Sequence, residues 1–267
     1  MNFQLYELIL IFFIYSFLGW CLEVSYAAIE TGEFVNRGFL YGAVCPIYGI
    51  GATIVIISLS PIIDNILILF LGSVLLTSLL ELIAGFILEK VFQNKWWDYS
   101  SLPFNIGGYI CLRFSLYWGI ACIFLMKIIH PFIYNFIGVI PIFLSKLIIL
   151  IMLLLLLVDL IATIITVLNL NKRLKLISDI SRNLKRISDD FGQTISDTSL
   201  KVSERISPIK EDLNRHILKV DELKIKYKEL FEKNVRSHNR ILKAFPNLKS
   251  KRYHNILEKL KNYHLRK

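Results

Sequence analysis

The sequence predicts an all-α, polytopic membrane protein, with a transmembrane helical bundle over residues 1–168 and a basic, helical, coiled-coil-like cytoplasmic tail over residues 169–267. The chain is 55% hydrophobic with a mean hydropathy of +0.55, which is too apolar for an ordinary soluble domain. Its charges are also segregated. Residues 1–168 carry six Lys or Arg against nine Asp or Glu, whereas the remaining residues carry 25 against 12. The first part is therefore suited to lipid and the second to water.

About five membrane spans are predicted, because five stretches approach the roughly 20 apolar residues that a spanning helix needs. They are residues 5–29, 43–61, 66–88, 109–129 and 142–168. The first contains Glu23 and has no basic residues before it, so we interpret it as a permanent helix and not a cleavable signal peptide. Residues 130–141 are apolar with a proline near each end, so a sixth membrane segment is also compatible with the sequence.

The distribution of basic residues predicts the orientation. Lys- and Arg-rich flanks stay in the cytoplasm, so the tail is expected there. Five crossings then place the N-terminus outside and put the loops with Arg37 and with Lys90 and Lys95 inside. The connections around residue 64 and over residues 130–141 contain no Lys or Arg and fall outside. We therefore expect a multi-pass protein of the cell membrane.

The tail has apolar residues at helical spacing. Leu170, Leu174 and Ile177 begin a stripe with steps of three and four residues, and Pro208 and the AFPN run at 244–247 interrupt the pattern. We expect three amphipathic helices, at about 169–206, 209–243 and 248–265, the first continuing from the last span. A solvated helix pair and a self-associating coiled coil are both compatible with this spacing.

Four ionisable residues are predicted at one depth in the cytoplasmic half of the bundle: Glu23, Glu81, Arg113 and Asp159. Counted from the cytoplasmic ends of their spans at 1.5 Å per residue, they lie roughly 6–14 Å below the boundary. Charges are costly in hydrocarbon, so they should face each other or a hydrated cavity. They form either a substrate or ion pathway or a structural network that Arg113 closes.

Small and polar residues share helix faces with these acids, and small residues allow helices to approach closely. The supporting residues on these faces are Gly19, Thr77, Gly85 and Glu89. Between the first two spans, four glycines and a proline over residues 38–51 predict an irregular segment whose amides could bind a polar ligand, or else a tight turn. Asn36, Arg37 and Tyr48 are candidate site residues there.

The loop after the third span contains Trp96, Trp97, Asp98 and Tyr99. Trp and Tyr favour the headgroup region, so these residues are either an interfacial anchor or a docking surface for a cytoplasmic partner. The sequence contains no ATP-binding P-loop and no other catalytic motif that we recognise. We expect neither enzyme activity in this chain nor a metal or cofactor.

Several motifs resemble the type IV ABC-transporter permeases, the CmpB-like membrane proteins of Gram-positive bacteria. They are YSFLGWCLE at 15–23, NRGFLYG at 36–42, CPIYG at 45–49, WDYS at 97–100, PFN at 103–105 and LRFS at 112–115. The resemblance covers about residues 12–130. It implies a membrane permease subunit that works with an ATP-binding subunit supplied in trans.

The alternatives are a membrane-anchored scaffold or sensor whose tail binds a partner or self-associates, and an ion-coupled carrier without an ATPase. Expected partners are the lipid bilayer, the ATP-binding subunit and a second copy of the chain, with no nucleic acid.

Overall fold

The computed structural model describes residues 3–199 and 206–265, and it confirms the all-α class. The chain divides into two compact units, Met1–Thr166 with Arg240–Lys251, and Val167–Asn239 with Arg252–Lys267. The first unit includes a segment, Arg240–Lys251, that the sequence analysis assigns to the tail.

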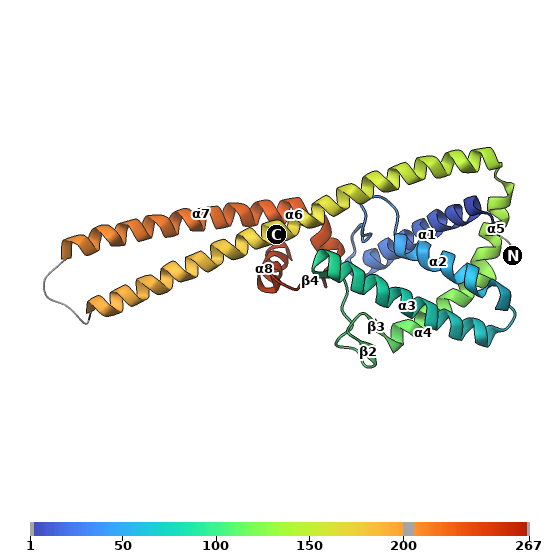
Figure 1. Cartoon of the computed structure of the whole chain (residues 1–267), viewed down its shortest axis with the longest axis horizontal. Helices are drawn as coiled ribbons and strands as arrows, with labels where there is room; N and C mark the ends of the chain where they lie inside the picture. The colour runs from blue at the N-terminus through green and yellow to red at the C-terminus, as the bar shows by residue number, and fades with distance from the viewer. Residues whose placement is uncertain (1–2, 200–205, 266–267) are drawn as a thin grey trace. The chain divides into compact units, whose positions relative to one another are not determined.

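The first unit is built from membrane-length helices (Figure 1). In chain order its helices are α1 (Leu5–Thr31), α2 (Pro46–Leu59), the 3-10 turn Ser60–Ile62, α3 (Ile66–Phe92), α4 (Leu112–Phe124), α5 (His130–Val139) and the first part of α6 (Ile142–Ser199). Within residues 3–199 and 206–265, four helices are long and apolar enough to cross a membrane, namely Leu5–Thr31, Ile66–Phe92, Leu112–Val139 and Ile142–Asp190.

Helix α2 is shorter than the predicted second span. It begins at Pro46, which is favourable at the first helical position because proline has no N–H to be satisfied there. Its 14 residues extend about 21 Å, less than the roughly 30 Å of bilayer hydrocarbon. The preceding residues 32–45 are non-helical, so the irregular segment predicted over residues 38–51 is confirmed only as far as Cys45.

Residues 130–141 do not form a separate membrane segment, because residues 130–139 continue the third long apolar helix, Leu112–Val139, through a π-helical turn at Leu125–Ile129. Pro131 accounts for this turn. Proline lacks the N–H of the regular helical bond, and its ring would clash with the carbonyl four residues earlier. Figure 1 shows α5 leaving in a different direction from α4.

The connections of the first unit alternate between its two ends. Figure 1 shows the loops over residues 32–45 and 93–111 at one end of the bundle, together with the segment 240–251. The N-terminus, the turn at residues 60–65 and α5 lie at the other end. This is the alternation that five passes require, although the orientation in the membrane remains a prediction.

The core of the bundle lies between α1, α2, α3 and the bent helix formed by α4 and α5. Its members include Leu10, Ile11, Val55, Ile56, Leu69, Met126 and Ile137. Helices α1 and α2 pack closely at Gly49, which has no Cβ. A Cβ at this position would overlap the Phe12 carbonyl oxygen and the Ser16 side chain. Small residues position α2 against α1 in this way.

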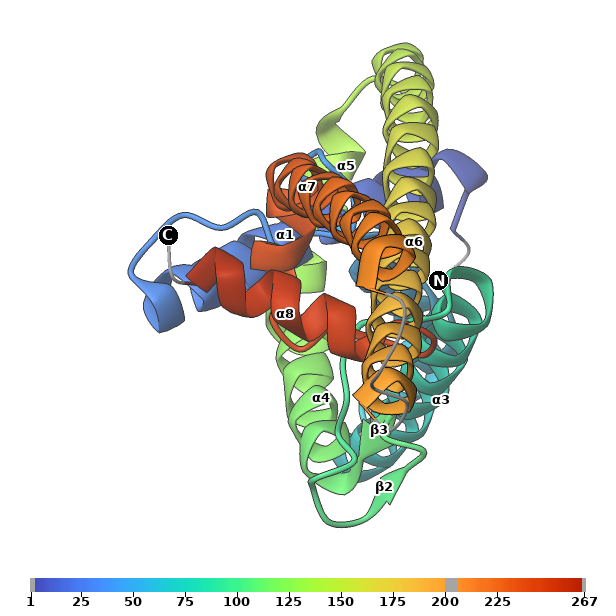
Figure 2. The ribbon, with the colours of Figure 1, turned by 90° about the vertical axis from the view of Figure 1, so that its left-hand side faces the viewer.

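The second unit contains the remainder of α6, α7 (Ile206–Ala244) as far as Asn239, and α8 (His254–Leu265). Three helices therefore occupy the described part of the tail, and the first continues from the last long apolar helix, but the third begins at His254 rather than near residue 248. Figures 1 and 2 show α7 returning alongside α6. The Arg173 guanidinium donates to the Lys233 carbonyl and the Ser237 hydroxyl across this hairpin.

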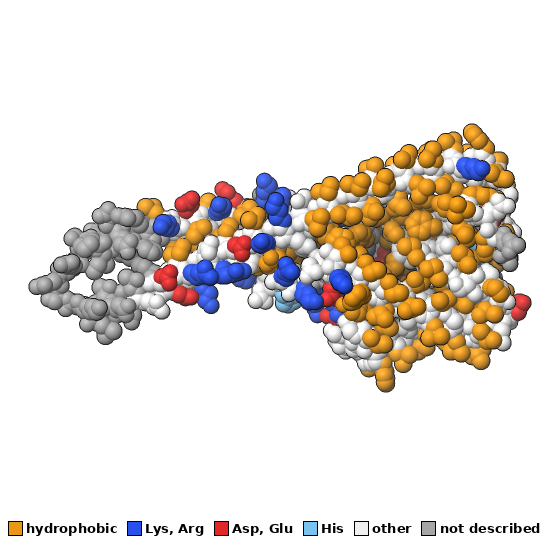
Figure 3. Space-filling view, in the orientation of Figure 1, with side chains coloured by type: hydrophobic (Ala, Val, Ile, Leu, Met, Phe, Trp, Pro, Cys, Tyr) orange, Lys and Arg blue, Asp and Glu red, His pale blue; other side chains and the backbone are white. Residues whose placement is uncertain are grey.

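The predicted apolar stripe is buried where it begins, at Leu170, Leu174 and Ile177. Further apolar residues of the tail, at positions 191, 209 and 213, have side chains outside the described residues. In the space-filling view, hydrophobic side chains cover the bundle helices, and Lys and Arg gather on the tail helices (Figure 3).

Helix α7 bends at His238, whose backbone leaves the helical region. The His238 ring Nδ1 donates to the Asn234 carbonyl oxygen at 3.1 Å, so the side chain reaches the acceptor four residues earlier. Just beyond this bend the chain passes from the second unit into the first. The residues that follow, 240–251, contact both loops at the same end of the bundle.

Candidate functional site

Two carboxylates and two tyrosine hydroxyls come together inside the loop-bearing end of the bundle. The Tyr48 hydroxyl on α2 donates to Glu23 Oε1 on α1 at 2.6 Å. The Tyr99 hydroxyl donates to Glu81 Oε1 on α3 at 3.1 Å. We refer to Glu23, Tyr48, Glu81 and Tyr99 as the tyrosine–carboxylate cluster.

Glycine allows the first of these pairs to form, because a Cβ on Gly19 would overlap the Tyr48 ring. Each tyrosine also contacts an aromatic ring of α4: Trp118 meets Tyr48 edge-on at 5.7 Å, and Phe114 stacks on Tyr99 at 4.7 Å. Rings from α4 therefore pack against both halves of the cluster.

The two halves of the cluster influence each other electrostatically. Burial raises the pKa of the Tyr99 hydroxyl above its usual value, and the neighbouring Glu81 and the more weakly acting Glu23 raise it further. Tyr99 consequently remains a hydrogen-bond donor at neutral pH. The second Glu81 oxygen, Oε2, is buried and has no hydrogen-bond partner among the described residues.

Among the described residues, Arg37 forms an ion pair with this cluster. Its Nε lies 3.5 Å from Glu23 Oε2, and its Nη1 lies 3.3 Å from Glu30 Oε2. The guanidinium also lies 4.9 Å from the Tyr26 ring centroid. Because the Glu23 and Arg37 side chains are 28% and 24% exposed, this ion pair is partly hydrated and contributes modestly to stability.

The expectation that Arg113 closes the acidic layer is not met. Arg113 is exposed on α4, and its Nε donates to the Tyr117 hydroxyl one turn later at 3.2 Å. Within the part of the chain that the structure describes, no ion pair joins it to Glu23, Glu81 or Asp159. A long side chain near a helix end can extend to the interface, which makes an inward partner unnecessary.

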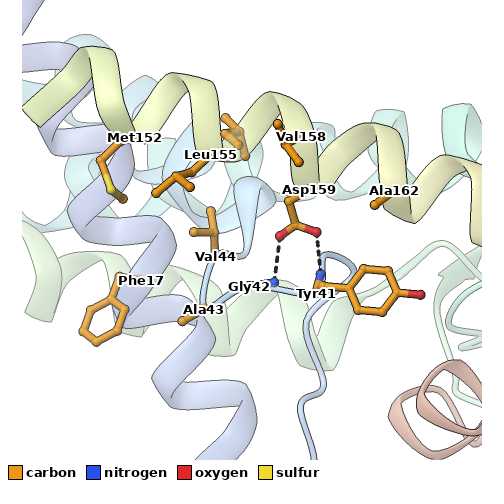
Figure 4. Close-up of a pocket in the computed structure, with 11 residues that line it drawn as sticks. Phe17, Tyr41, Gly42, Ala43, Val44, Met152, Leu155, Val158, Asp159 and Ala162 are labelled. Atoms are coloured by element: carbon orange, nitrogen blue, oxygen red, sulfur yellow. Dashed lines mark hydrogen bonds between the residues drawn. The ribbon is translucent and has the colours of Figure 1, made fainter.

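Asp159 forms a second site, on α6. Its two oxygens accept hydrogen bonds from the backbone N–H groups of Tyr41 and Gly42, at 2.8 and 2.7 Å (Figure 4). The Thr163 hydroxyl adds a bond of 3.2 Å, and the Tyr41 hydroxyl lies 2.8 Å from that of Thr166. The predicted polar layer is thus two sites, in which Asp159 binds the irregular loop while Glu23 and Glu81 meet tyrosines.

A groove of about 670 Å³ lies beside Asp159, between α1, the loop after it and α6. It is lined by Phe17, Tyr41, Gly42, Ala43, Val44, Met152, Leu155, Leu156, Val158, Asp159 and Ala162. Figure 4 shows Asp159 directed at the loop and apolar side chains along the remainder of the wall.

The same loop is bound on its other side by Arg240. The Arg240 guanidinium donates to the carbonyl oxygens of Gly38, Phe39 and Leu40 at 3.0, 3.1 and 2.9 Å. It also stacks over the Tyr41 ring, 4.2 Å from the centroid. Sequence reasoning missed this residue, because no local pattern links residues about 200 positions apart.

Asn36 organises the start of that loop. Its Oδ1 accepts from the Trp20 indole at 2.8 Å and from the Gly38 N–H at 3.2 Å, and its amide donates to the Tyr41 carbonyl at 2.7 Å. Predicted as a ligand-site candidate, Asn36 thus has local structural partners.

Two of the four predicted docking residues after α3, Trp96 and Asp98, contact the chain's own segment 240–251. Trp96 is buried, with the rings of Phe39 and Phe245 at 4.9 and 4.8 Å. Strand β1 (Asn94–Lys95) pairs antiparallel with β4 (Lys249–Ser250). Trp97 instead donates to the Tyr109 carbonyl at 2.8 Å.

Asp98 connects this loop to the same segment through charge. Lys249 Nζ lies 2.6 Å from Asp98 Oδ2, and Lys95 Nζ lies 3.0 Å from Oδ1. Burial alone would raise the Asp98 pKa, but hydrogen bonds from Lys249, Lys95 and Ser100 outweigh it and hold this pKa well below its usual value. Gly108 has φ +71°, and a Cβ there would overlap the same carboxylate.

The other supporting residues on α3 contribute packing and charge. Glu89 accepts from the Tyr109 hydroxyl at 2.9 Å and pairs with Lys251 at 3.6 Å. Gly85 makes room for Tyr109, because a Cβ would lie 2.8 Å from that ring. The Thr77 hydroxyl donates to its own helix, at the Ser73 carbonyl oxygen.

Comparison with known proteins agrees with this architecture. A family model described as "Putative ABC-transporter type IV" matches residues 10–164, more than half of the chain. The match runs from α1 to the part of α6 that carries Asp159, so it includes both sites. No curated protein and no solved structure matches the chain. The long apolar helices and this match together show that the chain is a membrane protein of the type IV ABC-transporter family.

Proposed function

We propose that this chain is the membrane-embedded permease subunit of its ABC-type transporter and that a separate ATP-binding subunit supplies the energy. Family membership over residues 10–164 supports the transporter class. The observation that carries the permease role is the tyrosine–carboxylate cluster, because it gathers polar groups from α1, α2, α3 and the α3–α4 loop inside an apolar bundle.

The cluster is suited to a polar or cationic group of the transported molecule. Glu23 and Glu81 each receive one tyrosine hydroxyl, and Glu81 Oε2 has no donor among the described residues. A buried carboxylate oxygen without a donor is unfavourable, so a substrate N–H or cation bound there would be stabilised. The surrounding aromatic rings favour the same class of ligand through cation–π attraction.

The loop-bearing end of the bundle is proposed to face the cytoplasm and the ATP-binding subunit. This end carries Arg37, Lys90 and Lys95, in accordance with the positive-inside rule. The composite surface formed by loop 93–111 and the segment 240–251 is the proposed docking region. An ATPase that binds there would act on both loops through Arg240 and Lys249, which already contact them.

Two measurements test this proposal. The tagged full-length chain would be purified from its native membranes, and a P-loop ATPase is expected to co-purify at a fixed ratio. In the purified complex, Glu81→Gln should leave expression and assembly intact but lower ATP hydrolysis in the membrane-reconstituted state. Glu7→Gln, which changes a carboxylate in the first turn of α1, is the matched control.

Normal hydrolysis and transport in Glu81→Gln would refute the role of the cluster. The absence of any ATPase, combined with full function of the isolated chain, would refute the permease assignment. If deletion of the tail then abolished function while the bundle stayed folded, the scaffold hypothesis would be favoured.

A further inference from the structure

We propose that the groove between α1, residues 41–44 and α6 binds one acyl chain of a membrane phospholipid whose primary-amine headgroup pairs with Asp159. The membrane depth and sidedness of this site rest on the proposed function. The inference names a lipid as the molecule that occupies the groove, which is separate from the tyrosine–carboxylate cluster.

The groove is large enough to hold part of an acyl chain. Its volume of about 670 Å³ lies within the range of roughly 300–1,000 Å³ that is usual for such sites. Phe17, Val44, Met152 and Leu156 contribute apolar walls, and Asp159 contributes a carboxylate. From Met152 to Asp159 the wall extends about 10 Å along α6.

The groove opens to lipid rather than to water. On its α6 wall, Leu155 is 61% and Val158 is 68% exposed, in the middle of a long apolar helix. In a bilayer such side chains face acyl chains. The molecule with access to this groove is therefore a lipid that enters laterally from the surrounding leaflet.

Apolar contact alone would not make the site selective. Lipid tails are as apolar outside the groove as inside it, so transfer of an acyl chain gains little from the hydrophobic effect. Selectivity must come from the polar end of the groove. That end is Asp159, and it is a fixed group because the Tyr41 and Gly42 amides hold both of its oxygens (Figure 4).

The charge at Asp159 favours a hydrogen-bond-donating cation. A carboxylate has about four lone-pair sites, of which two backbone amides and Thr163 use three. A primary ammonium group can donate to the remaining site, whereas a trimethylated ammonium group has no N–H to donate. The groove should therefore prefer an amine headgroup over a choline headgroup.

The test uses the full-length chain in nanodiscs with a phospholipid that carries a photoreactive diazirine on one acyl chain. After illumination, mass spectrometry should find the label on residues 41–44 and 152–162. Leu155→Trp, which fills the groove, should reduce this labelling about tenfold. Leu154→Trp is the matched control, because Leu154 is 56% exposed on the same helix but does not line the groove.

The headgroup is tested by competition. Unlabelled lipid with an ethanolamine headgroup should displace the probe at a concentration about tenfold lower than its choline equivalent, as expected for one charge-assisted hydrogen bond. Asp159→Asn should remove this difference.

Equal labelling in the two tryptophan variants, or equal competition by the two lipids in the unchanged chain, would overturn the inference. Neither readout requires the ATPase. Selective lipid labelling without an ATPase would contradict the proposed function alone, and an ATPase complex without selective labelling would contradict the lipid site alone.

Discussion

Arg240 is predicted to hold the segment 240–251 on the bundle, and Arg240→Ala should release it. The guanidinium donates to three consecutive carbonyl oxygens at 2.9–3.1 Å and stacks on Tyr41. Truncation would remove these bonds and leave the carbonyl oxygens of residues 38–40 without this donor.

The expected magnitude follows from these contacts. Hydrogen bonds from a charged donor contribute about 1.5–3 kcal/mol each, but burial of the guanidinium offsets part of that gain. Since Arg240 is only partly buried, we expect a net loss of about 3 kcal/mol, or roughly a hundredfold change in the docking equilibrium. Arg240→Lys should give a smaller loss, because an ammonium group lacks the planar set of donors.

Hydrogen–deuterium exchange of the full-length chain in nanodiscs measures this opening directly. Amide exchange over residues 241–251 should accelerate by up to about a hundredfold in Arg240→Ala, while the core of α3 remains protected. Arg252→Ala is the control, because Arg252 is exposed just beyond the segment. Unchanged exchange in Arg240→Ala would refute the reasoning, since strand pairing and Lys249 would then suffice to hold the segment.

Three further changes probe the bundle and its loops by thermal unfolding in detergent. The folded-state pKa of Asp98 lies below its unfolded value, so the stabilisation from its ion pair with Lys249 is present at neutral pH and lost as the pH falls below about 4. Asp98→Asn should therefore lower Tm at pH 7 and flatten its decline in acid, and a parallel decline would contradict the pair's role. His130→Phe should raise stability by about 1–3 kcal/mol, because neither nitrogen of this buried ring has a hydrogen-bond partner among the described residues; a lower Tm would show that the ring nitrogens are satisfied. Gly49→Ala should cost about 1–3 kcal/mol, because its Cβ would overlap a backbone oxygen of α1. Gly138→Ala, where a Cβ meets no atom within 4 Å, is the control and should leave Tm unchanged or slightly higher.

Helix positions were largely predictable because each depends on neighbouring residues. A run of about 20 apolar residues predicts a spanning helix without knowledge of its neighbours. The predicted spans at 5–29 and 66–88 agree closely with Leu5–Thr31 and Ile66–Phe92. The prediction was less accurate at Pro131, where hydropathy could not distinguish a bent continuation from a separate segment.

The candidate site was predicted in part. Glu23 and Glu81 were identified because charge in a membrane helix is costly, and the structure places both against tyrosine hydroxyls. Their partners were harder to predict, because a hydroxyl leaves no signal in hydropathy or net charge. The one guanidinium at the predicted depth, Arg113, is exposed, whereas Arg240 of the tail binds the loop.

Composition and periodicity were sufficient to establish a membrane bundle, its basic helical tail and the acidic residues that need an explanation. Both properties depend only on residues close together in the sequence, since each segment partitions into water or lipid according to its own side chains. Tertiary structure alone decided that Asp159 binds the loop amides, that Lys249 pairs with Asp98 and that the tail returns to the bundle. Those contacts join residues more than 100 positions apart, and their formation depends on how packed helices bring distant backbone groups within hydrogen-bond distance.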